Sequence, residues 1–163
     1  MIFYKKRSFI FYFFLISIII IIFYFINEKF KNEKTLSLEP ISINLITSVH
    51  PKLDWNFKPT KPKITIQPGD VTTVEYIVEN LSEKTGTGIA TFSYFPSEFG
   101  NYVNKINCFC YDAQTLKPNE KNKFVLVLLI DPEVTKDSKT KNIKEATIQF
   151  TFFNYKEYKK NKS

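Results

Sequence analysis

An uncharged, strongly apolar run near the start of the chain is the feature that most restricts how this protein folds. It extends from Ser8 to Ile26, SFIFYFFLISIIIIIFYFI. Its nineteen residues approach the roughly 20 that a helix needs to cross the core of a bilayer. A cleaved signal peptide has only about 7–15 apolar residues and ends in small residues, whereas this run ends in bulky ones. The sequence therefore predicts a transmembrane helix over residues 8–26.

The charges around this run predict its orientation. Lys5, Lys6 and Arg7 precede it, and an excess of basic residues marks the cytoplasmic side, although lysines beyond the run weaken the asymmetry. We therefore expect residues 1–7 in the cytoplasm and residues 27–163 on the outer side of the membrane. No Arg- and Ser-rich transit peptide precedes the run, which favours the periplasmic side of a bacterial inner membrane over the mitochondrial intermembrane space.

After the apolar run, the hydrophobic pattern changes from continuous to alternating. Residues 27–40 are polar, carry both charges and end in proline, which is typical of a linker. From Ile41 onward apolar residues recur at every second position, which is the spacing of strands, and turn residues separate the alternating stretches. The predicted strands cover residues 41–46, 63–67, 73–78, 89–95, 102–108, 123–130 and 146–153.

This pattern predicts the fold class. About seven short strands are typical of an immunoglobulin-like sandwich of about 100 residues, and a small antiparallel barrel is the alternative. The sequence therefore predicts an all-β fold, an immunoglobulin-like β-sandwich over residues 41–154 preceded by one N-terminal transmembrane helix. Residues 155–163 form a basic tail.

Charge and motif content exclude several functions. The net charge is +7, but the basic residues at the two ends account for all except +1, so the middle has no basic face for nucleic acid. The only histidine, His50, precedes Pro51 in a predicted turn, where a surface role is more usual than catalysis. Hydrolase and nucleotide-binding motifs are absent from the sequence, so we expect that the protein is not an enzyme.

The two cysteines, Cys108 and Cys110, stand one residue apart. In an extended strand such residues share a face with Cα atoms roughly 6.6–6.8 Å apart, at the upper limit for a disulfide. A disulfide within the pair is therefore disfavoured while the strand stays extended. Phe109 between them points to the opposite face and is expected in the core.

Two thiolates on one side can hold a soft monovalent ion. Thiolates select Cu(I), whereas zinc would be a ligand short with one Cys-x-Cys pair and one histidine. Buried inert cysteines and thiol–disulfide exchange remain the other interpretations; a lysine at position 105 could lower a thiol pKa for exchange.

The residues around the cysteines resemble a known family. Asn104-Lys105-Ile106-Asn107-Cys108-Phe109-Cys110-Tyr111 is similar to the N-K-I-x-C-F-C-[FY] signature of the CtaG-type cytochrome c oxidase assembly proteins, which are membrane-anchored copper chaperones. Further segments follow in family order: L-P-W-x-F-x-P at residues 53–59, G-x-A-T-F-N from Gly88, Q-T-L-x-P-G-E at residues 114–120, D-P-E at residues 131–133 and Y-T-F-F ending at Phe153.

The resemblance implies a function and a set of site residues. It implies an immunoglobulin-like domain on the outer side of the membrane and Cu(I) binding by Cys108 and Cys110, often in a dimer. It also implies delivery of the copper to copper centre B of oxidase subunit I. Lys105 sits where the family keeps a lysine beside the ligands.

Three differences from the family pattern are visible. The family usually has a further cysteine and a glycine-rich segment just after the anchor, and residues 27–40 contain neither. Asp54 replaces the proline before Trp55. Asn119 replaces a turn glycine, and asparagine tolerates left-handed backbone geometry.

The predicted function is thus a single-pass copper chaperone for oxidase assembly. A homodimer bridged by copper is expected, because two sulfurs per chain favour sharing the metal between chains. A membrane-tethered β-sandwich that scaffolds partner proteins without metal transfer is the alternative.

Overall fold

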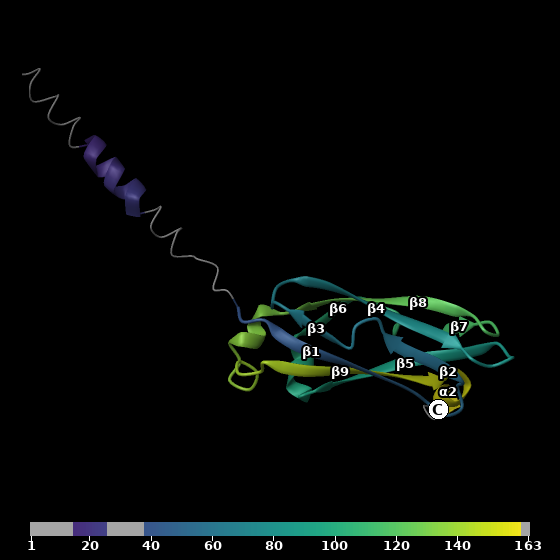
Figure 1. Ribbon diagram of the computed structural model, residues 1–163. Coiled ribbons are helices and arrows are strands. Elements are labelled where there is room, and N and C mark those ends of the chain that lie inside the picture. Colours follow the sequence, from purple (N-terminus) through teal and green to yellow (C-terminus); the bar gives the residue numbers. More distant parts are fainter. Residues whose placement is uncertain (1–14, 26–37, 161–163) are drawn as a thin grey trace, which may run out of the picture. The chain divides into compact units, whose positions relative to one another are not determined.

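The computed structural model describes residues 15–25 and 38–160 (Figure 1). Residues 15–25 are helical, and within the described residues no helix has the length and apolar character needed to cross a membrane. Residues 8–14 and 26 of the predicted transmembrane helix, the predicted cytoplasmic residues 1–7 and most of the predicted linker lie outside the described residues. The described residues 38–160 belong to a compact unit of their own, and residues 161–163 of the predicted basic tail lie outside the described residues.

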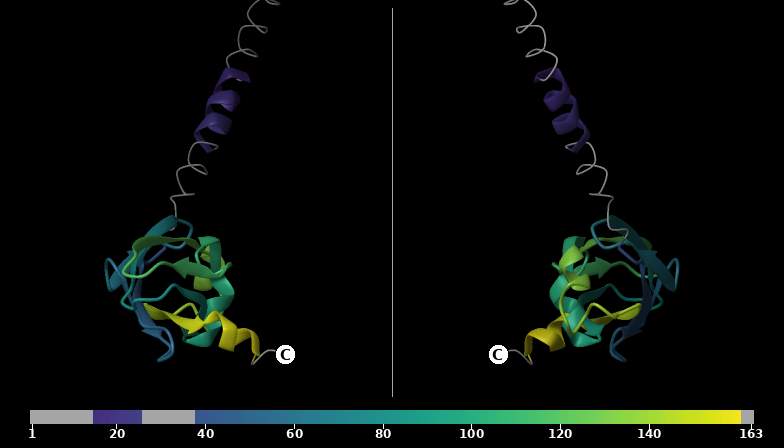
Figure 2. Two further views of the ribbon diagram at one scale, coloured as in Figure 1. Left: turned by 90° about the vertical axis from the view of Figure 1, so that its right-hand side faces the viewer. Right: turned by 90° about the vertical axis from the view of Figure 1, so that its left-hand side faces the viewer.

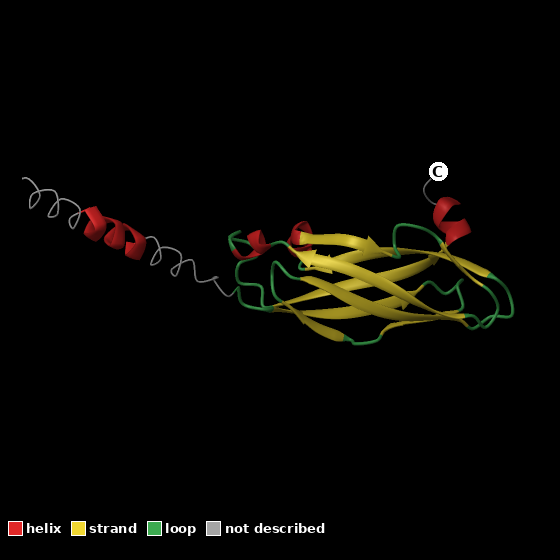
Figure 3. Cartoon of the chain, turned by 90° about the horizontal axis from the view of Figure 1, so that it is seen from above, coloured by secondary structure: helices red, strands yellow, loops and turns green. Residues whose placement is uncertain are grey.

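Strands make up most of this unit. They are β1 (Ile41–Val49), β2 (Trp55–Pro59), β3 (Lys63–Ile66), β4 (Val71–Asn80), β5 (Gly86–Phe95), β6 (Val103–Cys108), β7 (Gln114–Leu116), β8 (Lys121–Ile130) and β9 (Glu145–Asn154). The short 3-10 helices η1 (Ser97–Tyr102) and η2 (Pro132–Thr135) and the helix α2 (Tyr155–Lys160) lie at the ends of the strands (Figure 3). The all-β prediction is confirmed.

The strands form two sheets. One has five strands in the order β3-β1-β9-β5-β7, and the other has four in the order β2-β4-β8-β6. The pairing of β1 with β9 is parallel, and the other pairings are antiparallel. The seven predicted strands are all present, and the prediction missed β2 and β7, which are short.

The two sheets pack face to face (Figure 2). Aromatic side chains make up much of the core between them. Tyr76 on β4 meets Phe150 on β9 with ring centroids 5.6 Å apart, and Phe57 on β2 meets Phe152 on β9 at 4.8 Å. Tyr76, Phe150 and Phe152 are fully buried. Apolar side chains on alternate positions of both sheets therefore supply the core, and no disulfide links the two sheets in the described part of the chain.

Two turns have the backbone geometry that their residues favour. Gly69, in the predicted Pro68-Gly69-Asp70 turn, has φ of 97°, and Asn119 has φ of 56°. Asn119 thus adopts the left-handed conformation at a turn where a glycine is expected, because its short polar side chain tolerates that region. The turn is closed by the Glu120 amide, which donates to the Lys117 carbonyl at 3.1 Å.

Candidate metal centre

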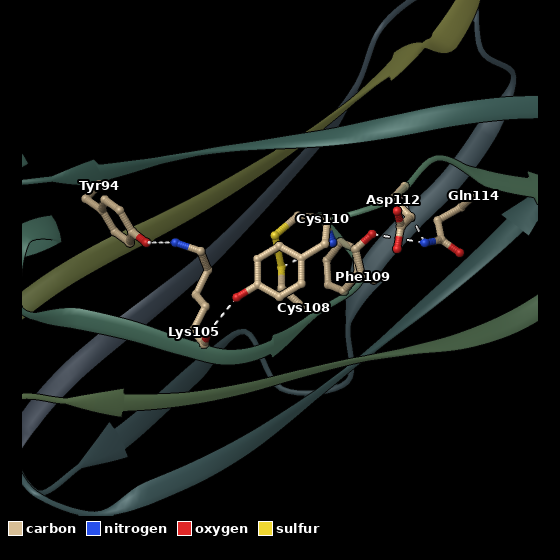
Figure 4. The surroundings of a disulfide bond; sticks show 8 residues. Tyr94, Lys105, Cys108, Phe109, Cys110, Asp112 and Gln114 are labelled. Carbon is tan, nitrogen blue, oxygen red and sulfur yellow. Dashed lines mark hydrogen bonds between the residues drawn. A yellow bond between two sulfur atoms is a disulfide. The ribbon is translucent and has the colours of Figure 1, made fainter.

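The two cysteines meet in a turn at the end of β6. The strand ends at Cys108, as predicted, and the Tyr111 amide then donates to the Cys108 carbonyl at 3.2 Å. This turn brings the Cα atoms of Cys108 and Cys110 to 5.0 Å, and their side chains form a disulfide (Figure 4). An internal disulfide was disfavoured only for a strand that stays extended through Cys110. The backbone turns after Cys108, so that condition is not met and the disulfide forms.

Phe109 fixes the turn to the core. Its ring is 8% exposed and lies 5.0 Å from the Phe150 ring and 5.3 Å from the Tyr76 ring, so its predicted burial is confirmed. Cys108 is also buried, at 4% exposed, whereas Cys110 is only partly buried. Cys110 is therefore the more accessible of the two cysteines.

Gln114 at the start of β7 supports the turn from its far end. Its Nε2 donates to the carbonyls of Phe109 at 3.0 Å and of Asp112 at 3.2 Å (Figure 4). The Cys110 amide also points to the Cys108 sulfur, at 3.2 Å. Sequence reasoning gave Gln114 no role, because only its place in a family segment marked it.

Lys105 on β6 directs its ammonium to the Tyr94 side chain on β5 (Figure 4). Its Nζ lies 3.5 Å above the centroid of the Phe92 ring and donates to the Tyr94 hydroxyl at 2.7 Å. Burial lowers the pKa of Lys105. Burial also raises the pKa of Tyr94 to about 12, with a smaller contribution from nearby Tyr111. The ammonium is therefore held by β5 and is directed away from the disulfide.

The main chain of Lys105 is tied to the cysteine turn. Its carbonyl accepts a hydrogen bond from the Tyr111 hydroxyl at 2.5 Å. A register shift in the pairing of β6 with β8 falls between Lys105 and Asn107, immediately before Cys108. Lys105 thus contacts β5 through its side chain and the turn through its carbonyl.

The site lies at an open side of the two-sheet domain. β6 is the edge strand of the four-stranded sheet, and β5 pairs with β7 only over Gly86 to Gly88, so its remaining residues have β9 as their one partner within the described chain. Phe92 on β5, Ile106 on β6 and Tyr111 directly after the cysteines are exposed. The cysteines are therefore next to surface that another molecule can reach.

The donors present fit a soft ion once the disulfide is reduced. Two thiolates suit Cu(I), whereas the described residues contain no cluster of three or more His, Cys, Asp or Glu side chains that could hold a metal. His50 lies in a turn and packs on Phe153, 5.6 Å between rings. The cysteine pair can change between a disulfide and a dithiol. In the dithiol form it offers two sulfur ligands to a metal.

Fold and site together define an all-β protein with a single cysteine pair at the end of an edge strand. The family model "Cytochrome c oxidase assembly protein CtaG/Cox11" matches residues 20–154, and the chain belongs to this family.

Three relatives illustrate the similarity. The cytochrome c oxidase assembly protein CtaG of Sinorhizobium fredii is 40% identical over 115 residues, 71% of this chain and 58% of that protein. The mitochondrial COX11 of Mus musculus is 34% identical over 131 residues, 80% of this chain and 48% of that protein. The CtaG of Ehrlichia ruminantium (strain Gardel) is 34% identical over 125 residues, 77% of this chain and 71% of that protein. The chain thus spans about half the length of the first two relatives.

A solved structure, the PapD-like domain 7 of human CEP192, covers 72% of this chain and 85% of its own with 13% identity and a TM-score of 0.30. This similarity is too low to support an argument about the fold.

Proposed function

We propose that this protein is a copper chaperone in cytochrome c oxidase assembly. In this proposal reduced Cys108 and Cys110 bind Cu(I) as cargo and deliver it to copper centre B of oxidase subunit I. The observation that supports it is the turn that brings both sulfurs together beside an open sheet edge, in a chain of the oxidase assembly family. The role is one of binding and transfer, not of catalysis.

The chemistry of the cargo follows from the donors. Thiolate sulfur is a soft ligand that favours Cu(I), and the thiols lose their protons when they bind metal, so binding strengthens as pH rises. The Phe109 ring, buried in the core, keeps the pair at a defined position while the copper enters or leaves. With two sulfurs per chain and no third cysteine, an incoming acceptor has few ligands to displace.

The proposal extends to placement in the cell. The apolar run over residues 8–26 would anchor the chain in a bacterial inner membrane, with residues 1–7 in the cytoplasm and residues 27–40 as a linker. The domain of residues 41–154, which we take to be immunoglobulin-like, and the basic tail of residues 155–163 would then face the periplasm.

Copper binding by the purified chain tests the assignment of the two cysteines as ligands. The full chain is purified in detergent, reduced without oxygen, supplied with Cu(I) and freed of loose metal with a competing chelator. We expect bound copper in the wild type and none in the matched Cys108→Ser, Cys110→Ser variant. Equal copper in both would remove the two cysteines as ligands.

Copper should also promote dimerisation. Two chains that share copper through four sulfurs satisfy the metal better than one chain with two sulfurs. Sedimentation of the copper-loaded chain at micromolar concentration should show dimers that disappear when the metal is removed. A loaded chain that stays monomeric would contradict copper bridging while leaving single-chain binding intact.

The scaffold alternative is favoured by one observation, the burial of Cys108. If the protein only holds partners together, thiols in the reduced native chain should resist alkylation, and their replacement should mainly lower stability. Rapid alkylation of the partly buried Cys110 in the native state would argue for a chemically active pair instead.

A further inference from the structure

A single side-chain hydrogen bond closes the chain around the cysteine pair. The Tyr111 hydroxyl donates to the Lys105 carbonyl at 2.5 Å, so the bond joins residues six apart and encloses both Cys108 and Cys110. The Tyr111 ring is 55% exposed, so it adds little to the core. Its hydroxyl therefore acts mainly on the conformation of the turn.

The acceptor of this bond is firmly held. Lys105 pairs with Leu128 in the sheet, and its ammonium contacts the Tyr94 hydroxyl and the Phe92 ring. The Tyr94 ring packs closely on Gly100, so closely that a Cβ added at Gly100 would lie 2.3 Å from a Tyr94 ring carbon. Because the Lys105 side of the bond is supported in this way, the bond restrains Tyr111 and the turn that precedes it.

We propose that the Tyr111 hydroxyl is a positioning group that holds the Cys108–Cys110 turn closed and so favours the disulfide over the dithiol. The turn places the two Cα atoms 5.0 Å apart. An extended chain would separate them by roughly 6.6–6.8 Å, at the limit for a disulfide, so opening the turn opposes the sulfur–sulfur bond. The dithiol has no such requirement.

The consequence for function rests on the proposed copper role. A disulfide offers no thiolate to Cu(I), so the pair must be reduced before loading. In that step two thiols of a reductant such as glutathione supply two electrons and two protons; the Cys108–Cys110 bond breaks, both cysteines become thiols, and the reductant becomes its disulfide. Tyr111 thus sets how reducing the surroundings must be before the chain accepts copper.

The test measures this equilibrium directly. The full chain and its Tyr111→Phe variant are equilibrated without oxygen in graded mixtures of reduced and oxidised glutathione, quenched with acid, alkylated and weighed by mass spectrometry. The chain contains only two cysteines, so the oxidised fraction reports this pair alone. We expect Tyr111→Phe to shift the equilibrium constant toward the dithiol by about 2- to 10-fold, the range for loss of one hydrogen bond. A tenfold change corresponds to about 30 mV.

Tyr102→Phe is the matched control. Its hydroxyl, at the end of η1, donates to Asp137 in the loop after η2 at 2.6 Å, so the variant loses a tyrosine hydrogen bond without touching the pair. The equilibrium between disulfide and dithiol in Tyr102→Phe should match that of the wild type. Tyr111→Leu, which also removes the ring, should shift at least as far as Tyr111→Phe.

The outcomes separate this inference from the proposed function. If Tyr111→Phe titrates like the wild type, or shifts no further than Tyr102→Phe, the positioning role is overturned whether or not copper binds. If the reduced wild type binds no copper, the copper role fails, while a shift confined to the Tyr111 variants would still support the positioning role.

Discussion

Replacing Phe109 with alanine tests whether the cysteine turn is anchored by the core. The ring is 8% exposed and packs between the two sheets. Its aromatic neighbours, with centroid separations from 5.0 to 5.9 Å, are Phe57, Tyr76, Phe124, Phe150 and Phe152.

The expected loss of stability follows from this environment. Truncation of a buried phenylalanine costs about 3–5 kcal/mol, because both the transfer free energy and the contacts around the new cavity are lost. The neighbours come from both sheets and cannot collapse into the gap without moving a strand. We therefore expect Phe109→Ala to lower the free energy of unfolding by about 4 kcal/mol.

Urea unfolding measures this loss. Trp55 is the only tryptophan and is 6% exposed, so its fluorescence reports unfolding of the domain. Phe95→Ala is the matched control, since Phe95 is 76% exposed and its removal should change stability by no more than about 0.5 kcal/mol. A loss below about 2 kcal/mol for Phe109→Ala, or one equal to that of the control, would refute the anchoring of the turn by the core.

Three further predictions concern the scaffold around the site. Gly88→Ala should lower the free energy of unfolding in urea by about 1–3 kcal/mol, because the new Cβ would lie 2.7 Å from a Leu53 methyl carbon. An unchanged unfolding midpoint would mean that Leu53 moves aside freely. Asn119→Gly should be neutral or slightly stabilising, whereas Asn119→Ala should lose about 1 kcal/mol at its φ of 56°; equal stability of the two variants would contradict the left-handed turn. The hydrogen bond from Tyr102 lowers the pKa of Asp137, so its stabilising effect is present above the usual carboxyl pKa and is lost as pH falls through the lowered pKa. The difference in unfolding free energy between the wild type and Tyr102→Phe should therefore become smaller in acid. A difference that does not depend on pH would count against this bond.

The sequence predicted the strands better than the site geometry. Period-two alternation located the strand that ends at Cys108, because that signal is local. The turn at Phe109 and Cys110 carries no glycine, proline or asparagine, so nothing local marked the departure from an extended chain. Its cause is long-range, namely the burial of the Phe109 ring between two sheets.

The residues that hold the turn were missed for the same reason. β7 is three residues long, too short to show alternation, and it carries Gln114. The contact of Lys105 with Phe92 and Tyr94 joins β6 to a strand of the other sheet, and no sequence periodicity records that pairing. Family resemblance did mark Lys105 as a site residue, but only the structure shows its ammonium on the rings of β5.

The most direct test of the copper role is the metal content of the oxidase in cells. The gene for this chain is deleted from its source organism and replaced by the wild type, by the Cys108→Ser, Cys110→Ser variant or by the Tyr102→Phe control, at matched protein levels. The account predicts that the wild type and the control restore an active oxidase with copper in centre B, and that the double serine variant yields oxidase lacking that copper. Full copper content and activity with the double serine variant would contradict the account.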